Sequence, residues 1–540
     1  MEDDMAKYKY DRFGVMIDMS RNAVMTTDAL KRFILALKRM GYNCVMLYTE
    51  DTYEVEGEPY FGYLRGRYSE SELKEIDDFA FNLGVEVIPC IQTLAHLNAF
   101  IRWRKTPIDC ADILLVDDEK TYQLIDRMLT TLRRCFRSDY IHLGMDEAHM
   151  LGRGEHLDRY GYEKSEVLMN RHLKRVNEIA ESHGYKPMIW SDMFFRSWNN
   201  GVYNIPKCEI PESVKKDYPK GVIPVYWNYY SKNQATYDNM FDNHKQLSKE
   251  IWFAGGAWCW SGITPHHTHS LETMFPAMRS CRENKVKNVI ITLWGDDGAE
   301  CSHFSQLPAL YHIIEYAKGN EDDAKIKAKF ERLFKISYDS FMKTELPNTL
   351  VGIKGSENPS KYMLYSDPFL GYFDLTVSEG VGEKYREAKE ELYAIAKTSR
   401  AYGYIFKTLA ALCEVLELKY EIGVKTRHAY RANDKEELKR LADDYLEISR
   451  RMKKLHTAFS YQWHKENKPH GFDIQEIRLF GVAGRIESLR KRLLDYVNGK
   501  VNCIEELEEE ILPYGNSTAG APTRCNEFKN YISPNVVTHG

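Results

Sequence analysis

The feature that most constrains this chain is a pattern that repeats eight times over about its first 320 residues. Each time, a short apolar run rich in β-branched residues precedes a longer segment with helical periodicity. The helical segments 26–41 and 69–84 begin at Thr or Ser and end on Gly, as helices prefer. The eight runs are 13–20, 43–50, 85–96, 140–147, 186–193, 222–230, 251–260 and 288–297. Eight such units predict a (β/α)8 TIM barrel.

An open doubly wound α/β sheet is the alternative architecture. We favour the barrel because no glycine-rich nucleotide fingerprint follows any of the runs. After about residue 320 the apolar runs stop, and long amphipathic helical patterns take over. The sequence therefore predicts a (β/α)8 TIM barrel over residues 8–320 and an all-helical C-terminal domain over residues 321–540.

Composition excludes several classes of protein. The net charge is −5 and no long Lys/Arg run occurs, so we expect no nucleic-acid partner. The charged start "MEDDMAKYKYDRF" does not resemble a signal peptide, and no stretch approaches the ~18 apolar residues of a membrane span. The 11 Cys are scattered, several within predicted strands, and lack paired metal-ligand spacing. We predict a cytoplasmic protein with reduced cysteines and no membrane partner.

Acids, one Arg, one His and several Trp gather where the predicted strands end, which is where such barrels place their catalytic groups. One Trp near a strand end usually indicates core packing. Four successive strands ending in Trp indicate an aromatic box around a small polar ligand, and carboxylates among aromatic rings suggest a sugar. The residues are Asp18, Arg21, Glu50, Asp51, His96, Asn98, Asp146, Glu147, Trp190, Asp192, Trp227, Tyr229, Tyr230, Trp258, Trp260, Trp294, Asp296 and Asp297.

The stretch "YIHLGMDEAHM" places two acids side by side at the end of the fourth run. By the two-residue period of a strand, His142 and Asp146 share one face, and Glu147 falls just past the strand. If one carboxylate is ionised, it raises the pKa of the other, which then keeps the proton that a general acid needs. On spacing alone, two solvated loop acids are an equal alternative.

The motif His142-x-Gly144-x-Asp146-Glu147 resembles the His-x-Gly-x-Asp-Glu signature of the β-N-acetylhexosaminidases of glycoside hydrolase family 20. The resemblance spans about residues 10–320 and includes "DMSR", "TED", "AHLN" and "WGD" in order. Many members carry Trp-x-Glu after the eighth strand, whereas this chain has Trp294-Gly-Asp296. The shorter acid leaves room for an axial O4, so both gluco and galacto sugars could fit.

The resemblance implies an exo-acting enzyme that releases terminal β-linked GlcNAc or GalNAc by substrate-assisted retaining hydrolysis, without metal or cofactor. Glu147 would be the acid/base, and Asp146 would orient the acetamido N–H. The substrate would be a small oligosaccharide or glycoconjugate, and family analogy allows a homodimer. Arg21 would bind O3 and O4 of the sugar, Asp296 would bind O4 or O6, and Tyr229 (with Tyr230 second) would bond the acetamido oxygen. The acetamido box would consist of Trp190, Trp227, Trp260 and Trp294. The network that supports Glu147 at the substrate would consist of His96, Asp51 and His142.

Three alternatives remain to be weighed. A non-catalytic sugar-binding TIM barrel would keep the Trp box and lose the acid pair, which is intact. A metal-dependent hydrolase could use His266, His267 and His269, but a solvated polar turn at a helix start is favoured. Arg478 and Arg485 could reach the barrel rim or a second subunit, but helix packing with a basic exposed face is favoured.

Overall fold

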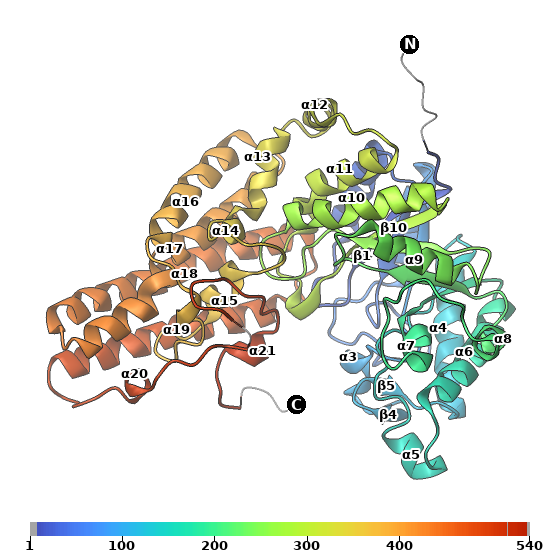
Figure 1. Cartoon of the computed structure of the whole chain (residues 1–540), viewed down its shortest axis with the longest axis horizontal. Coiled ribbons are helices and arrows are strands. Elements are labelled where there is room, and N and C mark those ends of the chain that lie inside the picture. The colour runs from blue at the N-terminus through green and yellow to red at the C-terminus, as the bar shows by residue number, and fades with distance from the viewer. Residues whose placement is uncertain (1–7, 516, 537–540) are drawn as a thin grey trace. The chain divides into compact units, whose positions relative to one another are not determined.

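The computed structural model describes residues 8–515 and 517–536 (Figure 1). Its contacts divide the chain into two compact units. The barrel unit comprises the residues up to Ala257 together with Ser270–Trp294 and Ala309–Ile326. The helical unit comprises Trp258–His269, Gly295–Pro308 and the residues from Lys327 onward. Two segments within the sequence range 8–320 thus cluster with the helical unit.

Eight parallel strands close into a barrel, which confirms the predicted fold class. Their order around the barrel is β1-β10-β9-β8-β7-β6-β3-β2. The first and last strands close the barrel by pairing Arg12 with Asn288 through Ile17 with Leu293. The strands are β1 (Arg12–Asp18), β2 (Cys44–Tyr48), β3 (Glu86–Cys90), β6 (Tyr140–His142), β7 (Lys186–Trp190), β8 (Ile223–Trp227), β9 (Trp252–Gly256) and β10 (Asn288–Leu293).

Helices cross over between successive barrel strands, and their ends follow local chemistry. Thr26 caps α1 by accepting from the Ala29 N–H, and Ser69 forms a reciprocal capping box with Glu72 at α2. The helices are α1 (Thr27–Met40), α2 (Glu70–Asn82), α3 (Asn98–Ile101), α4 (Glu119–Cys135), α5 (Glu155–Tyr160), α6 (Ser165–Ser182), α7 (Asp192–Trp198), α8 (Glu212–Asp217), α9 (Gln234–His244), α10 (His267–Glu283) and α11 (Leu307–Ala317). The antiparallel hairpin β4 (Ile108–Cys110) with β5 (Ile113–Leu114) follows α3 and was not predicted.

Large side chains fill the barrel interior. They include Met16, Met46, Ile88, Trp190 and Ile290, all nearly inaccessible to solvent, with Trp227 and Trp294 packed against them. A Cβ at Gly14 would lie 2.7 Å from the Cys44 carbonyl oxygen, so only glycine allows β1 and β2 this approach. The barrel is therefore a packed core whose chemistry lies at its ends.

Four long helices dominate the helical unit, and each packs against the next along the chain (Figure 1). They are α16 (Val381–Thr398), α17 (Gly403–Arg431), α18 (Lys435–Glu466) and α19 (Phe472–Val497). The helix α12 (Asp323–Phe334) begins in the barrel unit and ends in the helical unit. Shorter elements complete the helical unit: η1 (Asp296–Gly298), η2 (His303–Gln306), α13 (Tyr338–Met342), η3 (Lys343–Glu345), α14 (Leu346–Thr349), α15 (Pro359–Tyr365), η4 (Asp374–Thr376), α20 (Glu505–Glu508) and α21 (Phe528–Tyr531).

Two expectations for polar residues of the helical unit are wrong. His266, His267 and His269 are buried rather than solvated, and the His267 ring bonds the Thr344 hydroxyl at 2.8 Å. Burial lowers the pKa of His266 and of His267 to about 3, so both rings are neutral. Arg478 is not on an exposed basic face, because its guanidinium is buried and pairs with Asp297 at 3.0 Å and with Glu300 at 3.1 Å.

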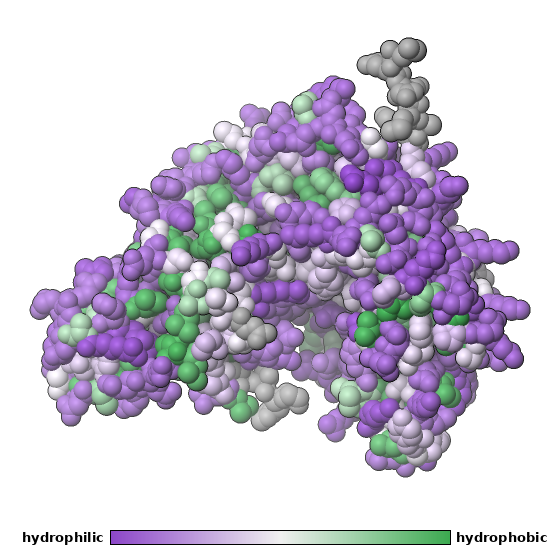
Figure 2. Space-filling model, viewed as in Figure 1, coloured by the Kyte–Doolittle hydropathy of each residue, from purple (hydrophilic) through white to green (hydrophobic). Residues whose placement is uncertain are grey.

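Within the described residues, no helix has the length and apolar character needed to cross a membrane. The face seen in Figure 2 is mostly hydrophilic, with apolar side chains in scattered patches.

Candidate active site

The loop after β6 carries the acid pair, and its path differs from the prediction. The strand ends at His142, so the two-residue period does not extend to Asp146. Gly144, Met145 and Glu147 have φ values of +75°, +71° and +52°, which turn the chain out of the extended conformation. A Cβ at Gly144 would lie 2.1 Å from Oε1 of Gln92, so this turn requires glycine. The turns leave Asp146 buried and the Glu147 side chain 46% exposed.

Asp146 is held by a hydrogen bond from Gln92 and by an ion pair with His96. Gln92 Nε2 donates to Asp146 Oδ1 at 2.7 Å, and Gln92 Oε1 accepts from the Met145 N–H at 3.1 Å. His96 Nε2 lies 3.2 Å from Asp146 Oδ2. Burial alone would raise the pKa of Asp146, but His96 and Gln92 outweigh it and hold that pKa below its usual value. Asp146 is therefore an anion at neutral pH.

His96 stands between the two acids. Its Nε2 lies 3.7 Å from Glu147 Oε2 as well as near Asp146. Burial disfavours the imidazolium, but the Asp146 carboxylate more than compensates and raises the pKa of His96 to about 9. The backbone of His96 has a φ of +58°, and its backbone N–H donates to the Asp112 carboxylate at 3.0 Å. The site thus contains a cation that bridges two carboxylates.

The acids after β2 divide between two partners. Glu50 lies 3.1 Å from Arg21 and accepts from the Tyr48 hydroxyl at 3.0 Å. Its charge also helps to raise the pKa of His96. Asp51 instead pairs with Arg65 at 3.3 Å. The structure therefore brings Arg21 near His96 through Glu50, while the supporting role of Asp51 stays a prediction.

Asp192 lies beneath Glu147, at the start of α7. It is fully buried, and its carboxylate accepts from the Glu147 N–H and from the Trp227 indole N–H, both at 3.3 Å. Burial, assisted by the charges of Asp146 and Glu147, raises the pKa of Asp192 to about 7. Asp192 thus links the backbone of one predicted catalytic residue to a tryptophan of the predicted box.

Aromatic rings line the same end of the barrel. Trp190 lies 5.9 Å from Trp294, Tyr48 lies 4.8 Å from Trp294, and Trp227 stacks on Tyr229 at 5.3 Å. The Tyr229 side chain is buried, whereas Tyr230 is exposed. Three of the four tryptophans predicted for the box therefore lie in one wall of the barrel unit, with Tyr229 beside them.

His142 supports this wall rather than titrating. Its ring lies 4.2 Å from the Trp190 ring, and Nδ1 accepts from the Gly144 N–H at 3.1 Å. Burial lowers the pKa of His142 to about 3, so the ring stays neutral.

Trp260 and Asp296 belong to the helical unit. Trp260 stacks on Trp258 with ring centres 4.2 Å apart, and Asp296 opens η1 two residues after Trp294. Their predicted roles at the sugar stay predictions.

Sequence reasoning gave no role to Gln92, Glu50 or Asp192, although it placed the two acids at strand ends. Gln92 had a detectable signal, because it is an amide within the apolar run "VIPCIQTL". A buried amide needs partners, and here it bonds Asp146 and the Tyr48 hydroxyl. Asp192 gave no comparable signal, because its contacts depend on the path of the Glu147 loop.

Donor atoms of His96, Asp146 and Glu147 all lie within 4.8 Å of one another, as metal ligands do. A metal ion needs the neutral imidazole, however, and the pKa of His96 is about 9. A second such group joins Asp117, His156 and Glu163, but Arg171 pairs with both of its acids. Neither group fits a resident metal as it stands.

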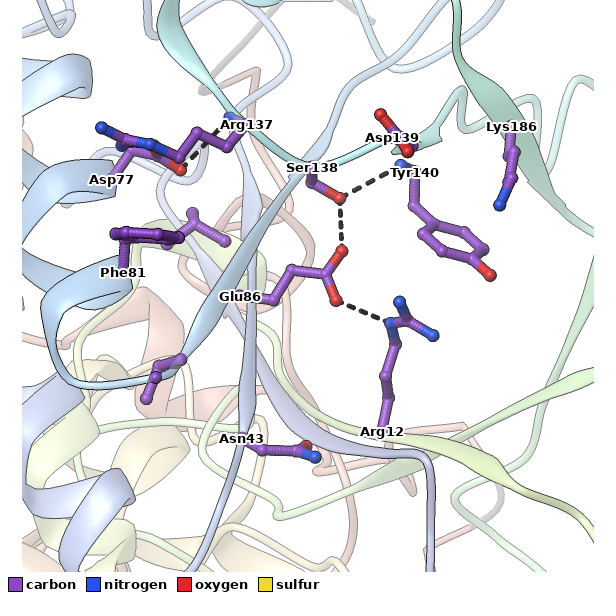
Figure 3. A pocket seen from close by; sticks show the side chains of 13 residues that line it. Arg12, Asn43, Asp77, Phe81, Glu86, Arg137, Ser138, Asp139, Tyr140 and Lys186 are labelled. Atoms are coloured by element: carbon purple, nitrogen blue, oxygen red, sulfur yellow. Dashed lines mark hydrogen bonds and ion pairs between the residues drawn. The ribbon is translucent and has the colours of Figure 1, made fainter.

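A cavity of about 470 Å³ opens at the opposite end of the barrel, where the strands begin (Figure 3). Arg12 donates to Glu86 at 2.7 Å and lies over the Tyr140 ring at 4.3 Å. Arg137 pairs with Asp77 in the same lining. Both arginines are matched by acids, and this end of a TIM barrel serves stability rather than catalysis.

Two family models match the chain. That of the glycosyl hydrolase family 20 catalytic domain matches residues 8–240, and that of the Glycoside Hydrolase 20C C-terminal domain matches residues 339–526. Together they cover more than three quarters of the sequence. The chain belongs to glycoside hydrolase family 20. It is therefore a glycoside hydrolase of the β-hexosaminidase kind.

Individual relatives are distant. Hexosaminidase D of Bos taurus is 22% identical over 333 residues, covering 56% of this chain and 90% of that protein. Hexosaminidase D of Homo sapiens is 24% identical over 335 residues, covering 56% of this chain and 64% of that protein. A solved exo β-N-acetylglucosaminidase from Vibrio harveyi, in complex with N-acetylglucosamine, is 13% identical with a TM-score of 0.46, over 62% of this chain and 58% of that one. That likeness is too weak to bear on the site.

Proposed function

We propose that this family 20 protein is an exo-β-N-acetylhexosaminidase that releases terminal, non-reducing β-linked GlcNAc or GalNAc by substrate-assisted retaining hydrolysis. The observation that carries the proposal is His96 between a buried Asp146 and a half-exposed Glu147. The arrangement offers one permanent anion and one accessible carboxyl group on the same side of the barrel, which is what this chemistry requires.

In the first step, Glu147 donates a proton to the glycosidic oxygen. The substrate's own 2-acetamido oxygen attacks the anomeric carbon, and the bond to the leaving sugar breaks. The product on the enzyme is an oxazolinium ion. In the second step, the Glu147 carboxylate takes a proton from water as that water attacks the anomeric carbon. The acetamido group is restored, and the β configuration is retained.

Asp146 suits the second role that the chemistry needs. As the acetamido group becomes an oxazolinium, its N–H gains positive charge, and a fixed carboxylate that accepts from it stabilises the transition state. Gln92 and His96 keep Asp146 ionised and hold both of its oxygens. A carboxylate fixed before the reaction begins needs no reorganisation.

The remaining assignments belong to the proposal. Trp190, Trp227 and Trp294 would enclose the acetamido group and the sugar face, and Tyr229 would bond the acetamido oxygen. Arg21 would bind O3 and O4 with its planar fork. Trp260, Asp296, a cytoplasmic location and a homodimer remain predictions from the sequence and the family.

The test is hydrolysis of 4-nitrophenyl β-glycosides of GlcNAc, GalNAc, glucose and galactose by the wild type and by Glu147→Gln. We expect cleavage of the two 2-acetamido sugars alone, strongly reduced in the variant. Because 4-nitrophenolate leaves with little protonation, some first-step activity in the variant is compatible with the proposal. Equal cleavage of sugars without the acetamido group would refute substrate assistance. Sugar binding without cleavage would favour the non-catalytic sugar-binding barrel.

A further inference from the structure

A cluster of two exposed tyrosines and a half-buried tryptophan lies on the loops at the catalytic end of the barrel. Tyr60 and Tyr63 come from the loop between β2 and α2, and Trp103 follows α3. Trp103 lies 5.8 Å from Tyr60 and 5.4 Å from Tyr63, ring centre to ring centre. The two tyrosines are 37% and 44% exposed. None of the three has a part in the mechanism above.

The loop that carries the cluster is rigidly built. Phe61, between the two tyrosines, is fully buried, with its ring 4.9 Å from Phe100 of α3 and 5.1 Å from Tyr53. A Cβ at Gly62 would lie 2.2 Å from the Asp51 carbonyl oxygen, so the loop backbone is packed tightly against the segment that follows β2. The Arg67 guanidinium bonds the Phe61 carbonyl oxygen. The buried side of the loop therefore fixes the rings on its outer side.

The cluster is continuous with the predicted site. Arg65 of the same loop pairs with Asp51 at 3.3 Å and bonds the Ser20 carbonyl oxygen, next to Arg21. On the other side, α3 begins two residues after His96. Both loops thus start at residues that surround the acid pair and carry the aromatic rings outward from it.

We propose that Tyr60, Tyr63 and Trp103 form a binding site for the leaving-group sugar, the pyranose on the reducing side of the bond that is cleaved. The inference rests on the proposed function and adds where the second sugar of an oligosaccharide lies. Flat ring faces pack against the C–H face of a pyranose, and the phenol hydroxyl groups can bond sugar hydroxyls.

A second copy of this chain is the other occupant to consider. Exposed charges surround the rings, since Arg102, Arg104 and Lys105 are all exposed, and the Lys105 amine lies 5.1 Å from the Tyr60 ring. The core of a protein interface is depleted of charge. A sugar site combines ring faces with charged and polar hydrogen-bonding groups, as this cluster does.

The experiment compares kcat/KM for N,N′-diacetylchitobiose, which has a leaving sugar, with kcat/KM for 4-nitrophenyl β-GlcNAc, which has none. The variants are Tyr63→Ala, Trp103→Ala and Trp103→Phe. Phe81→Ala is the matched control, because it removes an exposed ring at the other end of the barrel. We expect the chitobiose-to-aryl ratio to fall about tenfold in each alanine variant. It should recover in Trp103→Phe and stay unchanged in Phe81→Ala.

An unchanged ratio in both alanine variants, in a wild type that cleaves both substrates, would overturn the subsite and leave the proposed function standing. If the wild type cleaves neither substrate, the proposed function fails, and chitobiose titration followed by NMR tests the cluster. Equal affinity of wild type and Trp103→Ala for chitobiose would then overturn the proposed sugar site, and weaker binding of chitobiose by the variant would support it. Leu64 follows Tyr63 and is 66% exposed, so Leu64→Asp would disrupt a contact with a second copy of the chain. Loss of a dimer in the sedimentation of this variant, with an unchanged chitobiose-to-aryl ratio, would make this surface a protein interface.

Discussion

Replacing Asp192 by asparagine should change how the stability of the protein depends on pH. Burial and two neighbouring carboxylates raise the pKa of Asp192 from 3.8 to about 7. The native state therefore binds this proton more tightly than the unfolded chain does. The stability that Asp192 contributes is complete below about pH 3.8 and is lost as the pH rises through about 7.

The size of the effect follows from the two pKa values. Each unit of difference corresponds to about 1.4 kcal/mol, so between pH 5 and pH 8 the wild type should lose about 2–3 kcal/mol at this site. The amide introduced by Asp192→Asn cannot titrate. It offers one acceptor oxygen for two donors, the Glu147 and Trp227 N–H groups, so the substitution also carries a cost of about 1–3 kcal/mol that does not vary with pH.

The assay is urea unfolding of wild type and Asp192→Asn at pH 5 and pH 8, followed by tryptophan fluorescence. The free energy of unfolding of the variant, relative to that of the wild type, should rise by about 2–3 kcal/mol from pH 5 to pH 8. Asp158→Asn is the control, because Asp158 is an exposed acid on α5 in the same unit. A free-energy difference between Asp192→Asn and wild type that is the same at both pH values would refute the reasoning.

Three further substitutions test the rest of the site. His96→Gln removes the cation between the acids and should lower kcat/KM for 4-nitrophenyl β-GlcNAc by at least about 100-fold; a loss under tenfold would contradict its role. Gln92→Leu removes the donor to Asp146 Oδ1 and the acceptor of the Met145 N–H, and it should lower the free energy of unfolding in urea by about 1–3 kcal/mol. No change would show that these two hydrogen bonds are unimportant. Gly144→Ala should abolish activity and lower the melting temperature, because its Cβ would meet Gln92 at 2.1 Å; full activity would mean that the turn tolerates a side chain.

The barrel could be predicted from sequence because its strands are buried on both faces. Such strands appear as continuous apolar runs, and eight of them alternate with helical periods. The end of β6 could not be placed, since the apolar pattern continues through Leu143 and Met145 while the backbone turns at Gly144 and Met145. The hairpin of β4 and β5 went unnoticed because its strands have only three and two residues.

The environment of polar residues was harder to predict. His267 looked like part of a solvated turn, but its partner Thr344 lies 77 residues further along the chain. Arg478 likewise pairs with Glu300, which is 178 residues away. Local pattern cannot show such partners. The acid pair could be found because two adjacent carboxylates at a strand end indicate acid/base chemistry even when none of their partners is known.

The central claim is that the substrate's acetamido group is the nucleophile while Asp146 and Glu147 assist it. The most direct measurement is kcat for 4-nitrophenyl β-GlcNAc with mono-, di- and trifluorinated acetyl groups, since each fluorine weakens the acetamido oxygen as a nucleophile without changing the enzyme. We predict a steep fall in kcat with each fluorine. A kcat that is independent of fluorination would contradict the account, because an enzyme residue or water would then attack the anomeric carbon.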